Sequence, residues 1–159
     1  MKRAIIAFAC MLLCTMHLSA QTVDDLFKEF KNKENVEYIE IPKVMMSMAS
    51  GLVKKEDGGD LVKKINHVRI LSIEDNPTLS QEFSLKASNL KKKGYEEMVN
   101  SNEENEKTLI LVKSKGEAIS EMVILVTEPS ECSLIQLKGK LKPSDIHDLS
   151  GITDIKGSN

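Results

Sequence analysis

Apolar residues in the second half of the chain alternate with polar ones at a period of two, which is typical of β-strands. Segment 118–127 is apolar on both faces, because Met122 and Ile124 fall on one face and Val123 and Leu125 on the other. The strands predicted in this half are 95–99, 107–113, 118–127 and 132–141, with turns at 100–106, 115–116 and 128–130.

The last of these strands predicts a sheet that is buried on one face and solvated on the other. Ile135 and Leu137 fall on one face of segment 132–141, whereas Gln136 and Lys138 fall on the other. This alternation is typical of an antiparallel sheet that packs one face on a core.

Helical and strand patterns alternate in the first half of the chain. Apolar residues recur every three or four positions in the predicted helices 23–33, 43–55, 61–65 and 77–93, and period-two segments predict strands 36–41 and 67–73. A final short helix is predicted after Pro143 and Ser144, with Ile146, Leu149 and Ile152 pointing inward.

Two of these helices carry a distinct apolar stripe. In 43–55 the stripe predicted to be buried consists of Val44, Met45, Met48, Ala49, Leu52 and Val53, and in 77–93 it consists of Leu79, Phe83, Ala87 and Leu90. The helix 77–93 is predicted to start either with Pro77 at its first position or with a capping box of Thr78 and Gln81, and to end at Gly94.

The pattern as a whole predicts the α+β fold class. We expect an antiparallel or mixed sheet of about five to six strands, with helices packed mainly on one face. No linker rich in Pro, Gly or Ser divides the chain, so a single domain is expected over 21–152, with a flexible tail at 153–159.

The first twenty residues have the pattern of a secretory signal peptide. Lys2 and Arg3 precede an apolar run at 4–16, and the small residue Ala20 precedes Gln21. Signal peptidase is therefore expected to cut between Ala20 and Gln21, which predicts an exported protein of the periplasm or cell surface.

Two alternatives for the N-terminus remain open. The apolar run is shorter than the ~20 residues that span a bilayer, which disfavours an uncleaved anchor. A lipid anchor on Cys14 is disfavoured because Leu13, rather than a small residue, precedes the cysteine.

Removal of residues 1–20 changes the charge and the cysteine content. It leaves 20 Lys and Arg against 24 Asp and Glu, a net charge of −4, and no basic stripe that would indicate nucleic-acid binding. Cys132 becomes the single cysteine, so no internal disulfide is expected; it is predicted to be a half-buried small apolar residue.

Candidate metal ligands are few, and we expect no metal or cofactor. Met45, Met46 and Met48 are soft ligands suited to Cu(I), but core packing of a methionine-bearing helix explains them equally well. A zinc site would have to gather Cys132, His67 and His147 from distant parts of the chain.

Catalytic motifs are absent from the sequence, and no catalytic residue is predicted. There is no G-x-S-x-G or H-E-x-x-H motif, and Gly58-Gly59 lacks the rest of a phosphate loop. The acidic runs at 96–97 and 103–104 are expected to be solvated, and Asp145 and Asp148 to stabilise a helix start.

Several segments of the chain resemble a family of small exported bacterial proteins, the domain of unknown function 4252. The segments that carry the resemblance are 67–71, 92–95, 110–113, 119–123 and 134–141. The resemblance implies an exported protein of Gram-negative, Bacteroidetes-type bacteria, with no known activity and no catalytic residues. It also implies a link to envelope stress or signalling, because members are sometimes encoded near extracytoplasmic-function sigma factors.

The sequence favours a non-enzymatic envelope protein that binds a protein or another envelope component. The first alternative is a periplasmic protein that binds a small ligand or metal, which a deep pocket at Met46 or His67 would favour. The second is an unrecognised enzyme, which would require a histidine beside a buried carboxylate in a cleft.

Overall fold

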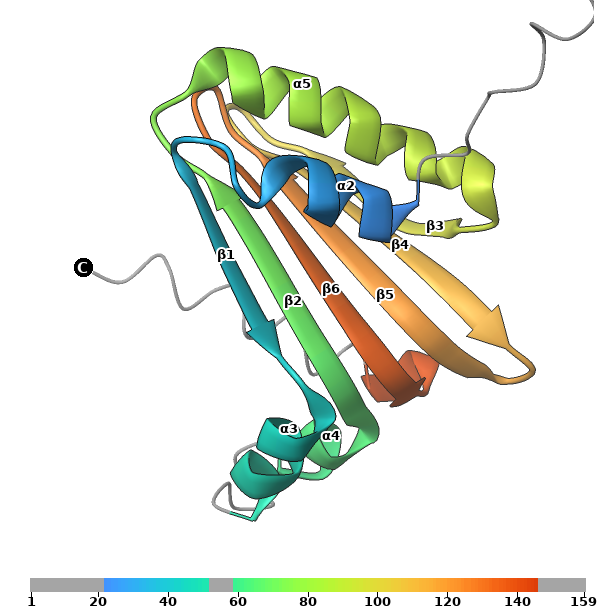
Figure 1. Cartoon of the computed structure of the whole chain (residues 1–159). Helices are drawn as coiled ribbons and strands as arrows, with labels where there is room; N and C mark the ends of the chain where they lie inside the picture. The colour runs from blue at the N-terminus through green and yellow to red at the C-terminus, as the bar shows by residue number, and fades with distance from the viewer. Residues whose placement is uncertain (1–21, 52–58, 146–159) are drawn as a thin grey trace, which may run out of the picture.

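The computed structural model describes residues 22–51 and 59–145 of the chain. Within them a six-stranded, fully antiparallel sheet has the strand order β1-β2-β6-β5-β4-β3 (Figure 1). The strands are β1 (Val36–Ile41), β2 (Ile65–Ile73), β3 (Glu96–Asn102), β4 (Lys107–Lys115), β5 (Ala118–Thr127) and β6 (Cys132–Leu141). The helices are α2 (Val23–Phe30), α3 (Lys43–Ser50), α4 (Gly59–Lys64), α5 (Pro77–Ser88) and the 3-10 helix η2 (Asn89–Lys93). The predicted α+β class is therefore confirmed.

The connections explain this strand order. After the pair β1–β2, α5 and η2 carry the chain across one face of the sheet, so that β3 forms at the edge opposite β1 (Figure 1). The chain then returns strand by strand, and β6 closes the gap beside β2. Three of the antiparallel pairs in this return are formed by neighbours in sequence, which is why their local pattern was sufficient to predict them.

The helices α2 and α5 cover one face of the sheet, which we call the helix face (Figure 1). Phe30 of α2 and Phe83 of α5 meet edge to face, with ring centroids 4.8 Å apart, and both are fully buried. A capping box between Thr22 and Asp25 fixes the start of α2. The core on this face contains Val23, Leu26, Phe27, Leu71, Ile73, Ala87, Leu90, Leu109, Leu111, Val123, Leu125 and Leu134.

The ends of α5 and η2 follow from local chemistry. The Asn76 side chain accepts a hydrogen bond from the Leu79 backbone N–H at 3.0 Å, and Pro77 occupies the first position of α5. The start at Pro77 is thus the one adopted. Gly94 ends η2 with a φ of 79°, a left-handed conformation that glycine adopts without strain. The predicted stripe is confirmed, because Phe83, Ala87 and Leu90 are buried and Leu79 packs against them.

The opposite face of the sheet is also apolar, which corrects the expectation of one buried and one solvated face. Met122, Ile124 and Leu137 are buried there, together with Ile119 and Leu141. The polar residue Gln136, which the pattern placed on a solvated face, instead lies on the helix face with an exposed fraction of 1%. The pattern failed because Arg69 and Glu121 from neighbouring strands hydrogen-bond the Gln136 side chain and so allow its burial.

The predicted buried stripe of α3 is also wrong. The structure buries Met46, whereas Val44, Met45 and Met48 have exposed fractions of 70%, 56% and 69%. Met46 belongs to the cluster on the second face, which includes Leu61 of α4. On a helix Met46 lies opposite Val44 and Met48, so burying the one exposes the others. Leu52 and Val53, which completed the predicted stripe, lie outside the described residues.

Smaller differences concern element ends. The helix predicted for 23–33 ends at Phe30. Strand β3 runs to Asn102, so the turn that follows it is only 103–106, where the Glu103 N–H donates to the Glu106 carbonyl at 2.8 Å.

Some predictions concern segments outside the described residues. These are the cleavage site at Ala20 and Gln21, the lipid anchor on Cys14, the tail 153–159 and the last helix beyond Asp145. Among the residues described, no helix combines the length and apolar character needed to cross a membrane.

We predict that Gly139→Ala destabilises the fold, because α4 approaches the backbone of β6 at this residue. A Cβ atom there would lie 2.1 Å from the Lys64 carbonyl oxygen and 3.1 Å from Ile65 Cα. The strand or α4 must move, which should lower the free energy of unfolding by about 1–3 kcal/mol in urea titrations.

Gly51→Ala is the matched control for this measurement. The nearest atom to its added Cβ, the Met48 carbonyl oxygen, would lie at an ordinary 3.5 Å. We expect a change of no more than about 1 kcal/mol, in the stabilising direction. Equal effects of the two substitutions would contradict the close approach of α4 to β6.

Candidate functional site

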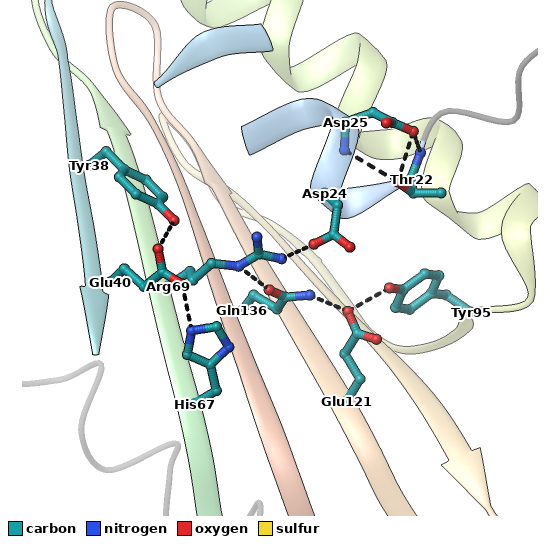
Figure 2. A network of polar contacts seen from close by, with 10 residues as sticks. All are labelled: Thr22, Asp24, Asp25, Tyr38, Glu40, His67, Arg69, Tyr95, Glu121 and Gln136. Atoms are coloured by element: carbon teal, nitrogen blue, oxygen red, sulfur yellow. Dashed lines mark hydrogen bonds and ion pairs between the residues drawn. The ribbon is translucent and has the colours of Figure 1, made fainter. Parts of the chain in front are cut away.

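Polar side chains gather on the helix face beside the start of α2 (Figure 2). Strand pairing places Glu40 of β1, Arg69 of β2 and Gln136 of β6 side by side across the sheet. The next row on the same face holds His67 of β2, Lys138 of β6 and Glu121 of β5. Most of these residues are joined in the network drawn in Figure 2.

Arg69 lies at the centre of this network. Its Nε donates a hydrogen bond to Gln136 Oε1 at 2.6 Å, and its Nη2 donates to Asp24 Oδ1 in the first turn of α2. The guanidinium also stacks 4.3 Å from the centroid of the Phe27 ring. The hydrogen bond from Arg69 lowers the pKa of the Asp24 carboxyl. Arg69 therefore fastens α2 to the middle of the sheet.

Gln136 extends the network towards β3. Its Nε2 donates to Glu121 Oε1, which also accepts a hydrogen bond from the Tyr95 hydroxyl at 2.7 Å (Figure 2). Burial, and then the bond to Glu121, raise the pKa of Tyr95. The phenol thus keeps its proton at neutral pH and acts as a hydrogen-bond donor. Among the described residues, every buried side-chain nitrogen and oxygen has a partner.

A second cluster joins His67, Glu40 and Tyr38 beside Arg69. His67 Nε2 lies 2.8 Å from Glu40 Oε1, and the Tyr38 hydroxyl donates to Glu40 Oε2 at 2.8 Å. The bonds from Tyr38 and then from His67 lower the pKa of the Glu40 carboxyl. The Glu40 side chain is 46% exposed. This pair therefore lacks the buried carboxylate that the enzyme hypothesis required.

The proposed zinc ligands do not come together. Cys132 pairs with Ile73 at one end of the β2–β6 ladder, whereas His67 pairs with Lys138 near the other. Six residues of extended β2 separate the two positions, roughly 20 Å. His147 lies outside the described residues. Within 22–51 and 59–145, no three His, Cys, Asp or Glu side chains are placed to hold a metal ion.

Exposed apolar side chains are concentrated on α3. Val44, Met45 and Met48 lie on one side of this eight-residue helix, and each is more than half exposed. We call these three residues the α3 apolar face. The other large exposed apolar residues in the described part of the chain are dispersed over β1, α5 and β3 and are Ile39, Leu85, Met98 and Val99. Isolated residues of that kind are ordinary, whereas a group of three is a candidate contact surface.

A hollow of about 400 Å³ lies where the start of α5 meets the turn after β5. Its lining includes Ser84, Leu85 and Thr127, and the Ser84 and Thr127 hydroxyls are hydrogen-bonded to each other at 3.0 Å. Neither Met46 nor His67 lines it, so it does not match the pocket that the ligand-binding hypothesis specified.

The sequence did not reveal the network around Arg69. The signal available in the sequence was that Arg69, Glu121 and Gln136 are each a polar residue within an otherwise apolar strand. Only the register of three strands and the position of α2 show that these residues meet. The α3 apolar face was missed because its methionines were assigned to the core. The acidic runs 96–97 and 103–104 are exposed, as predicted.

The family model described as a domain of unknown function (DUF4252) matches residues 30–149, which is more than half of the chain. The chain therefore belongs to this family, in agreement with the resemblance of its strands. No curated protein matches the chain.

We predict that the contact between Asp24 and Arg69 makes stability depend on pH. Since the pKa of Asp24 is lowered from 3.8 in the fold, the contact contributes fully above that value and is lost as the pH falls through the folded pKa. Asp24→Asn should cost at most about 1 kcal/mol near pH 7, because the carboxyl is more than half exposed and screened, and progressively less as the pH falls below 3.8.

Urea unfolding across this pH range measures the difference, and a double-mutant cycle supplies the control. In an Arg69→Met background, Asp24→Asn should have little effect at either pH. A cost of Asp24→Asn that is the same at both pH values in the parent chain would contradict the contact.

We also predict that Cys132 is inert in the folded protein. It is 1% exposed, and burial raises the pKa of its thiol to about 11. In the chain that starts at Gln21, alkylation at pH 8 should be roughly 100-fold slower than in denaturant. Equally fast alkylation of the folded chain would show that β6 is accessible at this residue.

Proposed function

We propose that this DUF4252 protein is an exported, non-enzymatic binding module that engages another component of the cell envelope through the α3 apolar face. The observation that carries the proposal is the exposure of Val44, Met45 and Met48 together on one short helix. Methionine side chains are flexible and polarisable, which suits them to contact surfaces that must adapt to a partner.

The way α3 is held supports this role. Met46 anchors the helix in the cluster on the second face of the sheet, with Leu61 and Ile65 from α4 and β2. The three outer side chains add little to that core, so their apolar character is not required for folding. Exposed apolar groups without a folding role are characteristic of binding surfaces.

The polar network supports binding rather than catalysis. Arg69, Gln136 and Glu121 use their hydrogen bonds to hold α2, β5 and β6 together. The Tyr95 phenol in the same network keeps its proton at neutral pH, because its pKa is raised. These groups are engaged with one another, which favours a positioning role over proton transfer.

The proposed location is the periplasm or the cell surface. Its support is the N-terminal pattern of Lys2 and Arg3, an apolar run and Ala20 before Gln21. The chain that remains after cleavage at Ala20 has Cys132 as its single cysteine, so an exported protein would contain no internal disulfide. A role in envelope signalling, which the resemblance to the family implies, is a further part of this proposal.

Site-specific photocrosslinking in the producing cells tests the function. A photoreactive residue replaces Met48 in one variant and Leu85 of α5, which is 63% exposed, in the matched control. We expect a reproducible adduct with an envelope component from position 48 and none of the same kind from position 85. Identical adducts from both positions, or none from position 48, would contradict the proposal.

A further inference from the structure

The two ends of the sheet carry opposite charge. One end of the sheet is formed by the segments 31–35, 103–106 and 128–131, which precede β1, β4 and β6, and by 74–76, which follows β2; acidic residues are in excess there. The exposed acids there are Glu34, Glu74, Asp75, Glu103, Glu104, Glu106 and Glu128, against exposed Lys31 and Lys107.

The other end is basic, and it is the end that carries α3 and α4 (Figure 1). Its exposed lysines come from α3, α4, the β4–β5 turn and the end of β6, and they are Lys43, Lys63, Lys115, Lys140 and Lys142. Among the residues described at this end, the exposed acids are Asp60, which pairs with Lys63 at 3.6 Å, and Glu117. We call this surface, together with the α3 apolar face, the basic end.

Contacts within the basic end hold its parts in fixed positions. Lys64 Nζ donates to Asp145 Oδ1 at 2.6 Å, and the Lys142 N–H donates to Asp145 Oδ2 at 2.7 Å. The close packing of Lys64 on Gly139 fixes α4 against β6 in the same place. These contacts hold α4 against the end of β6, and α3 packs in the same cluster as α4 through Met46 and Leu61.

We propose that the basic end docks on an anionic lipid surface, which names the envelope component of the proposed function and rests on that function. Val44, Met45 and Met48 enter the boundary between headgroups and acyl chains, and the lysines contact lipid phosphates. This combination of exposed apolar side chains and surrounding lysines is that of peripheral membrane-binding segments.

Three observations favour lipid over an acidic protein as the partner. The exposed positive charges of the basic end are lysines, which protein interfaces disfavour, and among its described residues there is no exposed arginine or aromatic residue. The helices α3 and α4 project beyond the ends of β1 and β2 (Figure 1), a shape suited to insertion into a soft surface. The acidic residues gather at the opposite end, which orients the molecule on a negative surface.

Vesicle sedimentation tests the proposal with protein purified from the envelope of the producing cells, its N-terminus determined by mass. If residues 1–20 remain, a chain that starts at Gln21 replaces it, because the described core residues lie between Val23 and Leu141. The vesicles are phosphatidylcholine alone or phosphatidylcholine with about a quarter phosphatidylglycerol. We expect at least ~10-fold tighter binding to the anionic vesicles, weakening as salt is added.

Two variants and their matched controls locate the surface. Lys140→Gln with Lys142→Gln should weaken binding about 25-fold, since each lysine near an anionic surface contributes about fivefold. Met45→Ser with Met48→Ser should weaken it by at least ~10-fold. Lys31→Gln with Lys107→Gln at the acidic end, and Leu85→Ser on α5, should leave binding within about twofold, and all variants should unfold like the parent chain.

The outcomes separate this inference from the function on which it rests. Equal binding to both kinds of vesicle, no binding to either, or equal losses in variants and controls would overturn lipid docking. If vesicle binding fails while position 48 still crosslinks an envelope protein, the binding module stands and its partner is that protein. If both experiments fail, the proposed function falls as well.

Discussion

The structure depends on a sheet whose two faces are both apolar and must both be covered. Apolar residues occupy consecutive positions in β5, so that Val123 faces α2 and α5 while Met122 and Ile124 face the other side. A sheet of this kind cannot rest on one layer of helices. The helices α2 and α5 cover part of the helix face, and α3 and α4 pack on one end of the second face. Met46 packs on this second face of the sheet. Its neighbours Val44, Met45 and Met48 on α3 are therefore exposed.

The helix face shows how polar groups are accommodated within the same constraint. The helices α2 and α5 leave part of this face uncovered, and Arg69, Gln136 and Glu121 occupy the region next to α2. Because Gln136 is 1% exposed, its amide would be costly to bury without partners, and it has one on each side. The network thus positions α2 while satisfying its own hydrogen bonds, and the binding role is assigned to the basic end instead.

The sequence was a good guide where structure is decided locally. The bounds of β5 and β6, the stripe of α5 and the glycine that ends η2 depend on residue spacing and backbone chemistry alone. The side of α3 that is buried was not predictable from the sequence. A short helix of Val, Met and Ala has apolar residues on most sides, and tertiary contacts determine which of them are buried. The burial of Gln136 was not predictable either, since it depends on Arg69 from a strand more than sixty positions away.

The central claim is that α3 buries Met46 and presents Met45 and Met48 outward, and oxidative footprinting of the methionines tests it directly. Oxidation rates follow solvent exposure, which is 56% for Met45 and 69% for Met48 but 8% for Met46 and 0% for Met122. The account predicts rapid oxidation of Met45 and Met48 and slow oxidation of Met46, at a rate close to that of Met122. Oxidation of Met46 as fast as that of Met48, or protection of all three in the free protein, would contradict it.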